Sequence, residues 1–135
     1  MTAITVPRTT AAKASFLRFA IRLDAVISGL MGIVGVPFAH QIAEMSGSTP
    51  SFEYSVGAFF IAYGVTLYVL AAAPAIRRIG AGIIAANVVF AIVALAVLAA
   101  GVLPLTAMGV AMMLATIAST LGFAYLQYLG VRRLA

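Results

Sequence analysis

The sequence predicts an all-α protein: a bundle of four transmembrane helices with both termini in the cytoplasm. Three observations carry this prediction. The 135-residue chain is 64% hydrophobic and 8% charged, whereas a soluble domain is about 45–50% apolar and about 25% charged. Four segments are long and apolar enough to cross a bilayer core, which takes roughly 20 helical residues. The basic residues flank these segments on one side only.

The four predicted spans cover, in order, residues 16–38, 53–73, 79–102 and 105–128. Helices are expected rather than strands, because lipid offers backbone N–H and C=O groups no other partner. Residues 16–129 therefore form the membrane domain. Residues 1–15 are small and polar and are predicted to be a flexible cytoplasmic tail, and residues 130–135 a short basic cytoplasmic tail.

The basic residues predict the direction of threading. They precede or begin the first span, join the second to the third, and follow the fourth, at Arg8, Lys13, Arg18, Arg22, Arg77, Arg78, Arg132 and Arg133. The loops on the other side contain no lysine or arginine. The positive-inside rule then places both termini in the cytoplasm. These residues form no patch interleaved with aromatics, so the net charge of +5 does not predict nucleic-acid binding.

The segment after the first span is predicted to be a short amphipathic helix lying in the outer interface. Pro37 suits its start and Gly47 its end, and one face carries Phe38, Ile42 and Met45.

His40 and Glu44 would lie on the polar face of that helix as a surface pair. Together with Glu53 they would supply one histidine and two carboxylates, enough ligands for a three-residue metal site. Their spacing, however, matches no established metal motif. The chain has no cysteine. We therefore expect no metal and no cofactor.

Asp24 is an acidic residue about eight positions into the first span, which places it below the headgroups but short of the midplane. Side chains expected at a similar depth complete a candidate polar layer: Asn87, Thr66, Ser119 and Tyr125. This layer is consistent with hydrogen bonding between helices. The same residue could instead bind a proton or cation in a transport cycle, or be exposed at the interface.

Small residues line the same helix beside Asp24, at Ser28, Gly29, Gly32 and Gly35. Such residues let helix backbones approach closely in lipid, where van der Waals contact drives association. The first span is therefore predicted to be the helix on which the others pack.

The stretch "LRFAIRLDAVISGLMGIVGVPFAHQIAEMSG", residues 17–47, resembles the opening of small four-helix membrane proteins of the DoxX-like type. Shared features are an arginine–leucine start, a glycine-rich first helix, a proline and a short amphipathic helix. The resemblance covers about a quarter of the chain. It implies a four-helix bundle with an auxiliary role, and it supplies no catalytic residues.

The preferred function is an accessory or structural subunit of a larger membrane complex, in a bacterial inner membrane. Its expected partners are the lipid bilayer and either another membrane protein or a second copy of itself. We find no nucleophile–base pair or phosphate loop, so no enzymatic activity is expected. The alternative is a proton-coupled exporter of small lipophilic molecules that uses Asp24. Small multidrug transporters also carry an acid in the first helix, but this chain lacks their tryptophan and their glutamate.

Overall fold

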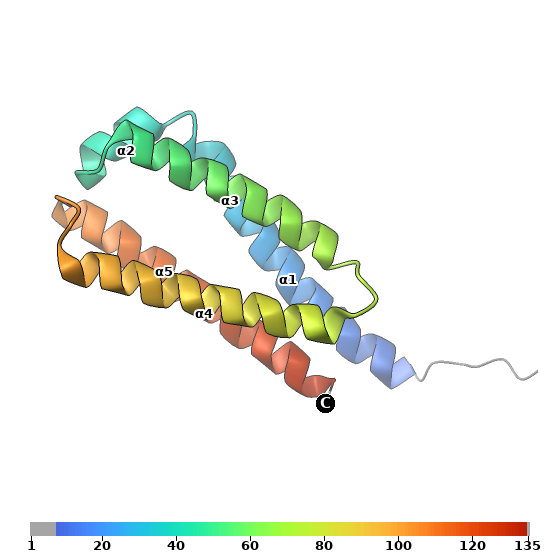
Figure 1. Ribbon diagram of the computed structural model, residues 1–135. Helices are drawn as coiled ribbons and strands as arrows, with labels where there is room; N and C mark the ends of the chain where they lie inside the picture. Colours follow the sequence, from blue (N-terminus) through green and yellow to red (C-terminus); the bar gives the residue numbers. More distant parts are fainter. Residues whose placement is uncertain (1–7, 135) are drawn as a thin grey trace, which may run out of the picture.

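The computed structural model describes residues 8–134, and this part of the chain folds into helices joined by short loops. In order they are α1 (Arg8–Gly35), α2 (Ala39–Ser46), α3 (Pro50–Leu70), α4 (Ile76–Ala100) and α5 (Ala107–Arg133). The predicted all-α class is confirmed. Four long helices form the bundle, and the short α2 lies across one end of it (Figure 1).

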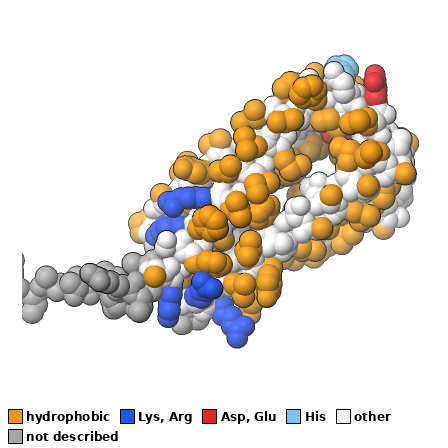
Figure 2. Space-filling view, turned by 180° about the vertical axis from the view of Figure 1, so that it is seen from behind, with side chains coloured by type: hydrophobic (Ala, Val, Ile, Leu, Met, Phe, Trp, Pro, Cys, Tyr) orange, Lys and Arg blue, Asp and Glu red, His pale blue; other side chains and the backbone are white. Residues whose placement is uncertain are grey.

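Three of the described helices, α3, α4 and α5, are each long and apolar enough to cross a membrane. The first helix qualifies together with α2 as a pair bent by 92°, so the chain has three or four candidate spans. Large apolar side chains cover the face seen in Figure 2, and many of them are more than half exposed, among them Phe19, Val65 and Ile92. Such a surface suits lipid rather than water. The chain is a small multi-pass membrane protein.

Charge separates the two ends of the bundle (Figure 2). Lysine and arginine gather where α1 begins and α5 ends, and we call this the basic end. The opposite end holds α2, with Glu44 and Glu53 near it, and we call this the α2 end. The start of α1 and the end of α5 both lie at the basic end (Figure 1).

Helix boundaries follow local capping signals. Thr49 accepts a hydrogen bond from the Phe52 N–H, and Pro50 occupies the first turn of α3, where the missing proline N–H costs nothing. Thr106 caps α5 in the same way through the Gly109 N–H. Gly47 ends α2 in the left-handed region, at a φ of 80° that suits glycine.

The observed boundaries differ from the predicted ones by a few residues at most ends. The larger difference is at α1, which already begins at Arg8. Residues 8–15 of the predicted flexible tail are therefore helical, because alanine and lysine favour helix and no breaker follows Pro7; residues 1–7 lie outside the described part. Helix α5 continues to Arg133 and so includes most of the predicted basic tail.

Glycines bring α1 and α3 into close backbone contact. A Cβ atom on Gly32 would lie 2.8 Å from the Ile61 backbone nitrogen, and one on Gly64 would lie 2.7 Å from the Ala25 carbonyl oxygen and 2.8 Å from Gly29 Cα. The predicted small-residue face of the first helix is thus used at Gly29 and Gly32. Around Gly35 there is open space instead.

Two arginines tie the basic end together. Arg18 Nη1 donates to the carbonyl oxygens of Ala71 and Ala73, at 2.6 and 2.9 Å, where α3 ends. Ala71 is the C-cap of α3 and Ala73 lies in the loop that follows, so the guanidinium binds carbonyls that no further helical turn can reach. The guanidinium of Arg133 lies over the Phe16 ring, 4.0 Å from its centroid.

Helix α2 bridges α3 and α5 at the other end. Its buried side is small and consists of Ala39, Ala43 and Ser46. Of the three residues of the predicted apolar face, Phe38 and Met45 are exposed and Ile42 is half-buried. Thr106 fixes the bridge, because its N–H donates to the Ser46 carbonyl oxygen at 2.9 Å and its hydroxyl to the Met45 carbonyl oxygen at 2.5 Å.

Candidate functional site

A buried polar network lies in the half of the bundle nearer the basic end. Asp24 is 2% exposed, and its Oδ2 accepts hydrogen bonds from Gln127 Nε2 at 2.8 Å, Asn87 Nδ2 at 3.2 Å and the Tyr63 hydroxyl at 3.3 Å. Its Oδ1 accepts from the Ser28 hydroxyl at 3.0 Å. Asn87 Nδ2 also donates to Gln127 Oε1 at 3.0 Å. The Tyr63 hydroxyl lies 2.6 Å from Asn87 Oδ1, so its single proton is shared between Asn87 and the more distant Asp24.

Each of the four long helices contributes to the network: α1 through Asp24 and Ser28, and the others through Tyr63 from α3, Asn87 from α4 and Gln127 from α5. The donors converge on the carboxylate, and within residues 8–134 no buried side-chain nitrogen or oxygen lacks a partner. A fully satisfied network specifies one arrangement of the helices, since any other leaves polar groups unpaired in an apolar interior. The network therefore fastens the four helices at one point.

The structure brings two of the five predicted polar-layer residues together, Asp24 and Asn87. It places Thr66, Ser119 and Tyr125 elsewhere: all three are exposed, and the Thr66 hydroxyl donates to the Ala62 carbonyl oxygen of its own helix. These residues lie near the predicted depth along their helices, but on the side of each helix that faces away from the bundle interior. Tyr125 is 62% exposed, whereas the fully buried Gln127 lies two residues further along α5 and hence on the other side of it.

Sequence reasoning missed Tyr63 and Gln127. One signal could have found the second of them. Asn87 and Gln127 are the only carboxamide side chains in the four long apolar segments, and such groups require partners in a membrane interior. Tyr63 offers no comparable signal, because tyrosines are also common at membrane interfaces.

An aromatic layer follows the network toward the α2 end. Phe59 stacks on Tyr63 with 6.0 Å between ring centroids and on Phe90 with 6.1 Å. Phe60 meets Phe90 edge to face at 6.2 Å. These contacts join α3 to α4 next to the polar network.

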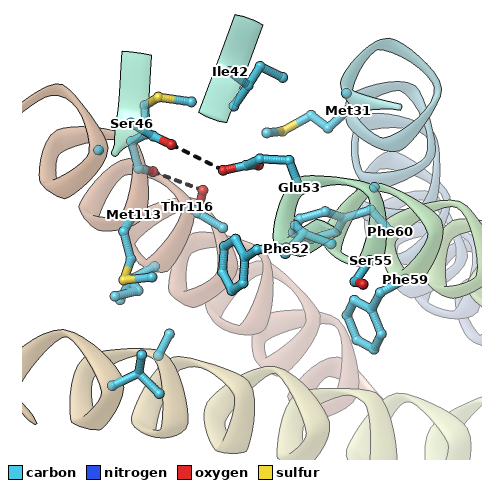
Figure 3. A pocket seen from close by; sticks show the side chains of 18 of the residues that line it. Met31, Ile42, Ser46, Phe52, Glu53, Ser55, Phe59, Phe60, Met113 and Thr116 are labelled. Carbon is cyan, nitrogen blue, oxygen red and sulfur yellow. Dashed lines mark hydrogen bonds between the residues drawn. The ribbon is translucent and has the colours of Figure 1, made fainter. Parts of the chain in front are cut away.

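Beyond this layer the bundle encloses a cavity of about 510 Å³. It lies between α1, α2 and α3 on one side and α4 and α5 on the other, and it is partly open to the outside. Figure 2 shows the molecule hollowed near its α2 end. The lining is mostly apolar, with aromatic and methionine side chains such as Met31, Phe52, Phe60 and Met113 pointing into it (Figure 3).

Glu53 is the acidic residue that lines this cavity. It lies in the first turn of α3 and is half-buried. Its Oε1 accepts a hydrogen bond from the Ser48 hydroxyl at 2.5 Å. It also accepts one from the Ser46 hydroxyl at 3.2 Å (Figure 3). Within the described residues no hydrogen bond to its Oε2 is formed. The other polar residues of the lining are Ser46, Ser55 and Thr116.

His40 and Glu44 lie apart from Glu53. Both are exposed on α2, and His40 meets Tyr54 edge to face with 5.9 Å between ring centroids. No three histidine, cysteine, aspartate or glutamate side chains come together as a metal site within residues 8–134.

Comparison with known proteins finds no matching family model, no similar curated protein and no similar solved structure. The resemblance to DoxX-like proteins therefore stays a prediction from the sequence, and the chain's own geometry carries the functional argument.

Proposed function

We propose that this protein binds a small lipophilic molecule, which enters from the bilayer and occupies the cavity near the α2 end, without catalysis. The observation that carries the proposal is the cavity itself. Its volume of about 510 Å³ lies within the range of roughly 300–1,000 Å³ typical of small-molecule sites. Aromatic and methionine side chains with few polar groups form its lining, and flexible methionines accommodate apolar ligands of different shapes.

Asp24 is not expected to take part in ligand binding. Its carboxylate is already bound by four donors of its own chain, and the aromatic layer lies between it and the cavity. We therefore assign Asp24 a structural role rather than the proton-coupling role in an exporter. An efflux activity that depends on a pH gradient and disappears in Asp24→Asn would contradict this assignment.

An accessory role in a larger membrane complex is compatible with ligand binding and stays part of the proposal. We also propose that the basic end faces the cytoplasm of a bacterial inner membrane, because the arginines lie there. The cavity would then lie in the outer half of the bilayer. A stoichiometric partner retrieved in mild detergent would support the accessory role, and a C-terminal alkaline phosphatase fusion active in the periplasm would overturn the orientation.

The chain contains no tryptophan, so a single introduced tryptophan reports on its own surroundings. Phe60→Trp places the reporter in the cavity lining. Val89→Trp is the matched control, because Val89 is 58% exposed, does not line the cavity and neighbours Phe90 in the aromatic layer. The probe is 1-bromonaphthalene, a neutral quencher of tryptophan fluorescence, added to protein in nanodiscs.

Quenching of the Phe60→Trp reporter should saturate at a lower probe concentration than quenching of the Val89→Trp control. The control reports only the partition of the probe into lipid. Adding Ala94→Phe should remove the difference, because Ala94 lines the cavity and a phenyl ring would fill part of it. Ala96→Phe should not, because Ala96 is exposed and outside the lining. Equal, non-saturating quenching at both reporters would refute the proposed function.

A further inference from the structure

Glu53 gives the cavity a chemical polarity that its apolar lining does not explain. The carboxylate lies at the α2 end of a cavity whose walls are otherwise mostly hydrocarbon and aromatic rings (Figure 3). Both hydroxyl groups that bind it, from Ser46 and Ser48, donate to the same oxygen, Oε1. The other oxygen receives no hydrogen bond from the described residues, and it remains available to an occupant of the cavity.

Among the residues that the structure describes, no basic side chain lines the cavity to balance that carboxylate. All eight lysines and arginines are in α1 before Asp24, in the first turn of α4, or in the last turn of α5. They therefore lie toward the basic end, beyond the polar network and the aromatic layer. Glu44, the nearest other charged residue along the chain, lies in α2 and adds a second negative charge at the α2 end. The electrostatic field at this end of the cavity consequently favours a cation.

The lining also favours a cation with an apolar body. Phe52 and Phe60 come from the same helix as Glu53 and line the same cavity. Aromatic faces attract cations, and more strongly where water is excluded, and the remaining apolar wall requires an occupant that is itself mostly hydrocarbon. An anionic or strongly hydrated ligand would meet Glu53 without any compensating charge.

We propose that the occupant of this cavity is a small lipophilic cation, whose positive group pairs with Glu53 Oε2 and whose apolar body packs against Phe52, Phe60 and Met113. This inference rests on the proposed function and adds the chemical class of the ligand. The proposed ligand is a compact molecule with an amine, quaternary ammonium or phosphonium group, not a phospholipid. A cavity of about 510 Å³ suits one compact apolar body better than two acyl chains.

Tritiated tetraphenylphosphonium is the probe, measured by equilibrium dialysis against the full chain in detergent. Tetraphenylborate has the same shape and the opposite charge, so it serves as the matched competitor. The variant is Glu53→Gln, whose amide oxygen can still accept from Ser48 and which removes only the charge. Glu44→Gln is the matched control variant, because Glu44 is exposed and outside the lining.

Glu53→Gln should weaken tetraphenylphosphonium binding by about tenfold, which corresponds to about 1.4 kcal/mol, and Glu44→Gln by less than about twofold, as expected of an exposed charge. Tetraphenylborate should not compete. Circular dichroism and unchanged 1-bromonaphthalene quenching in Glu53→Gln with the Phe60→Trp reporter would show that the cavity is intact.

The outcomes separate the two proposals. Tetraphenylphosphonium binding that is unaffected by Glu53→Gln, or that tetraphenylborate displaces, would overturn the cation assignment while the cavity binding of 1-bromonaphthalene stands. Competition by phosphatidylethanolamine that depends on Glu53 would overturn it in favour of a lipid ammonium group. Loss of saturable 1-bromonaphthalene quenching in the unaltered cavity would instead refute the proposed function itself.

Discussion

Replacing Asp24 by leucine should destabilise the bundle, whereas replacing it by asparagine should change its stability little. Asparagine can place its amide oxygen where Oδ2 lies and keep the donors Gln127 and Asn87. Its amide nitrogen, in the place of Oδ1, can donate to the Ser28 hydroxyl, which is able to accept. Leucine offers none of these contacts and leaves Gln127 Nε2 without an acceptor.

The size of the effect depends on two opposing contributions. Four hydrogen bonds reach the carboxylate, and at about 0.6 kcal/mol each in a membrane protein their loss costs about 2 kcal/mol. Burying a carboxylate in a medium of low polarity is itself costly, and leucine relieves that cost. We expect the first contribution to win, because removing one member of a buried network leaves its partners unsatisfied. Asparagine should lose less than about 1 kcal/mol.

Stability can be measured in mixed micelles by raising the mole fraction of SDS and following the fraction of protein that resists a short protease pulse. The leucine variant should unfold at a lower SDS fraction than the asparagine variant. Gln127→Leu provides a second check. Combined with Asp24→Leu, it should add less than its effect alone, because both changes remove the same bond. A leucine variant as stable as the unaltered protein would show that the network does not hold the helices together.

Three further changes test other contacts by the same assay. Gly64→Ala should destabilise the protein by about 1–3 kcal/mol, because its Cβ would overlap α1 backbone atoms at 2.7–2.9 Å. The control Gly82→Ala, with open space around it, should be neutral or stabilising. Equal effects of the two substitutions would contradict the close packing of α1 against α3. Arg18→Gln should cost about 1–3 kcal/mol through the two carbonyls it leaves unbound, whereas Arg22→Gln, which is exposed, should cost less than about 0.5 kcal/mol. Thr106→Val should cost about 1 kcal/mol as a lost helix cap, and an unchanged unfolding midpoint would show that the bridge from α2 to α5 is dispensable.

Much of the fold could be predicted because lipid imposes strong rules on composition and length. Apolar segments near 20 residues identified the candidate spans, and the glycine at position 47 identified the end of α2. The boundaries were less accurate where a local signal was not used. Thr49 and Pro50 form a standard helix start, three residues before the predicted start of the second span. Likewise, the alanine-rich residues after Arg8 contain no helix breaker, and α1 runs through them.

The candidate site was less predictable because it depends on which face of each helix points inward. Depth along a helix follows from counting residues, and it correctly related Asp24 to Asn87. Which side of a helix points inward depends on how neighbouring helices pack, and for α1 and α3 the glycine contacts between them decide this. The cavity could not be predicted at all, since it reflects a separation between helices rather than any motif. Glu53 was identified only as a weak candidate metal ligand.

The separation that creates the cavity is a consequence of two fixed points. At one, the hydrogen bonds around Asp24 draw the four long helices together, and the contacts of Phe90 with Phe59 and Phe60 extend that junction. At the other, α2 lies between α3 and α5 and is held by the two bonds of Thr106. Gly109 permits this, because any Cβ there would collide with the Ser46 carbonyl oxygen. Helix α2 thus separates the start of α3 from the start of α5, while the network holds the same helices together further along the bundle. The cavity lies between these two fixed points, so the packing of the fold itself creates it.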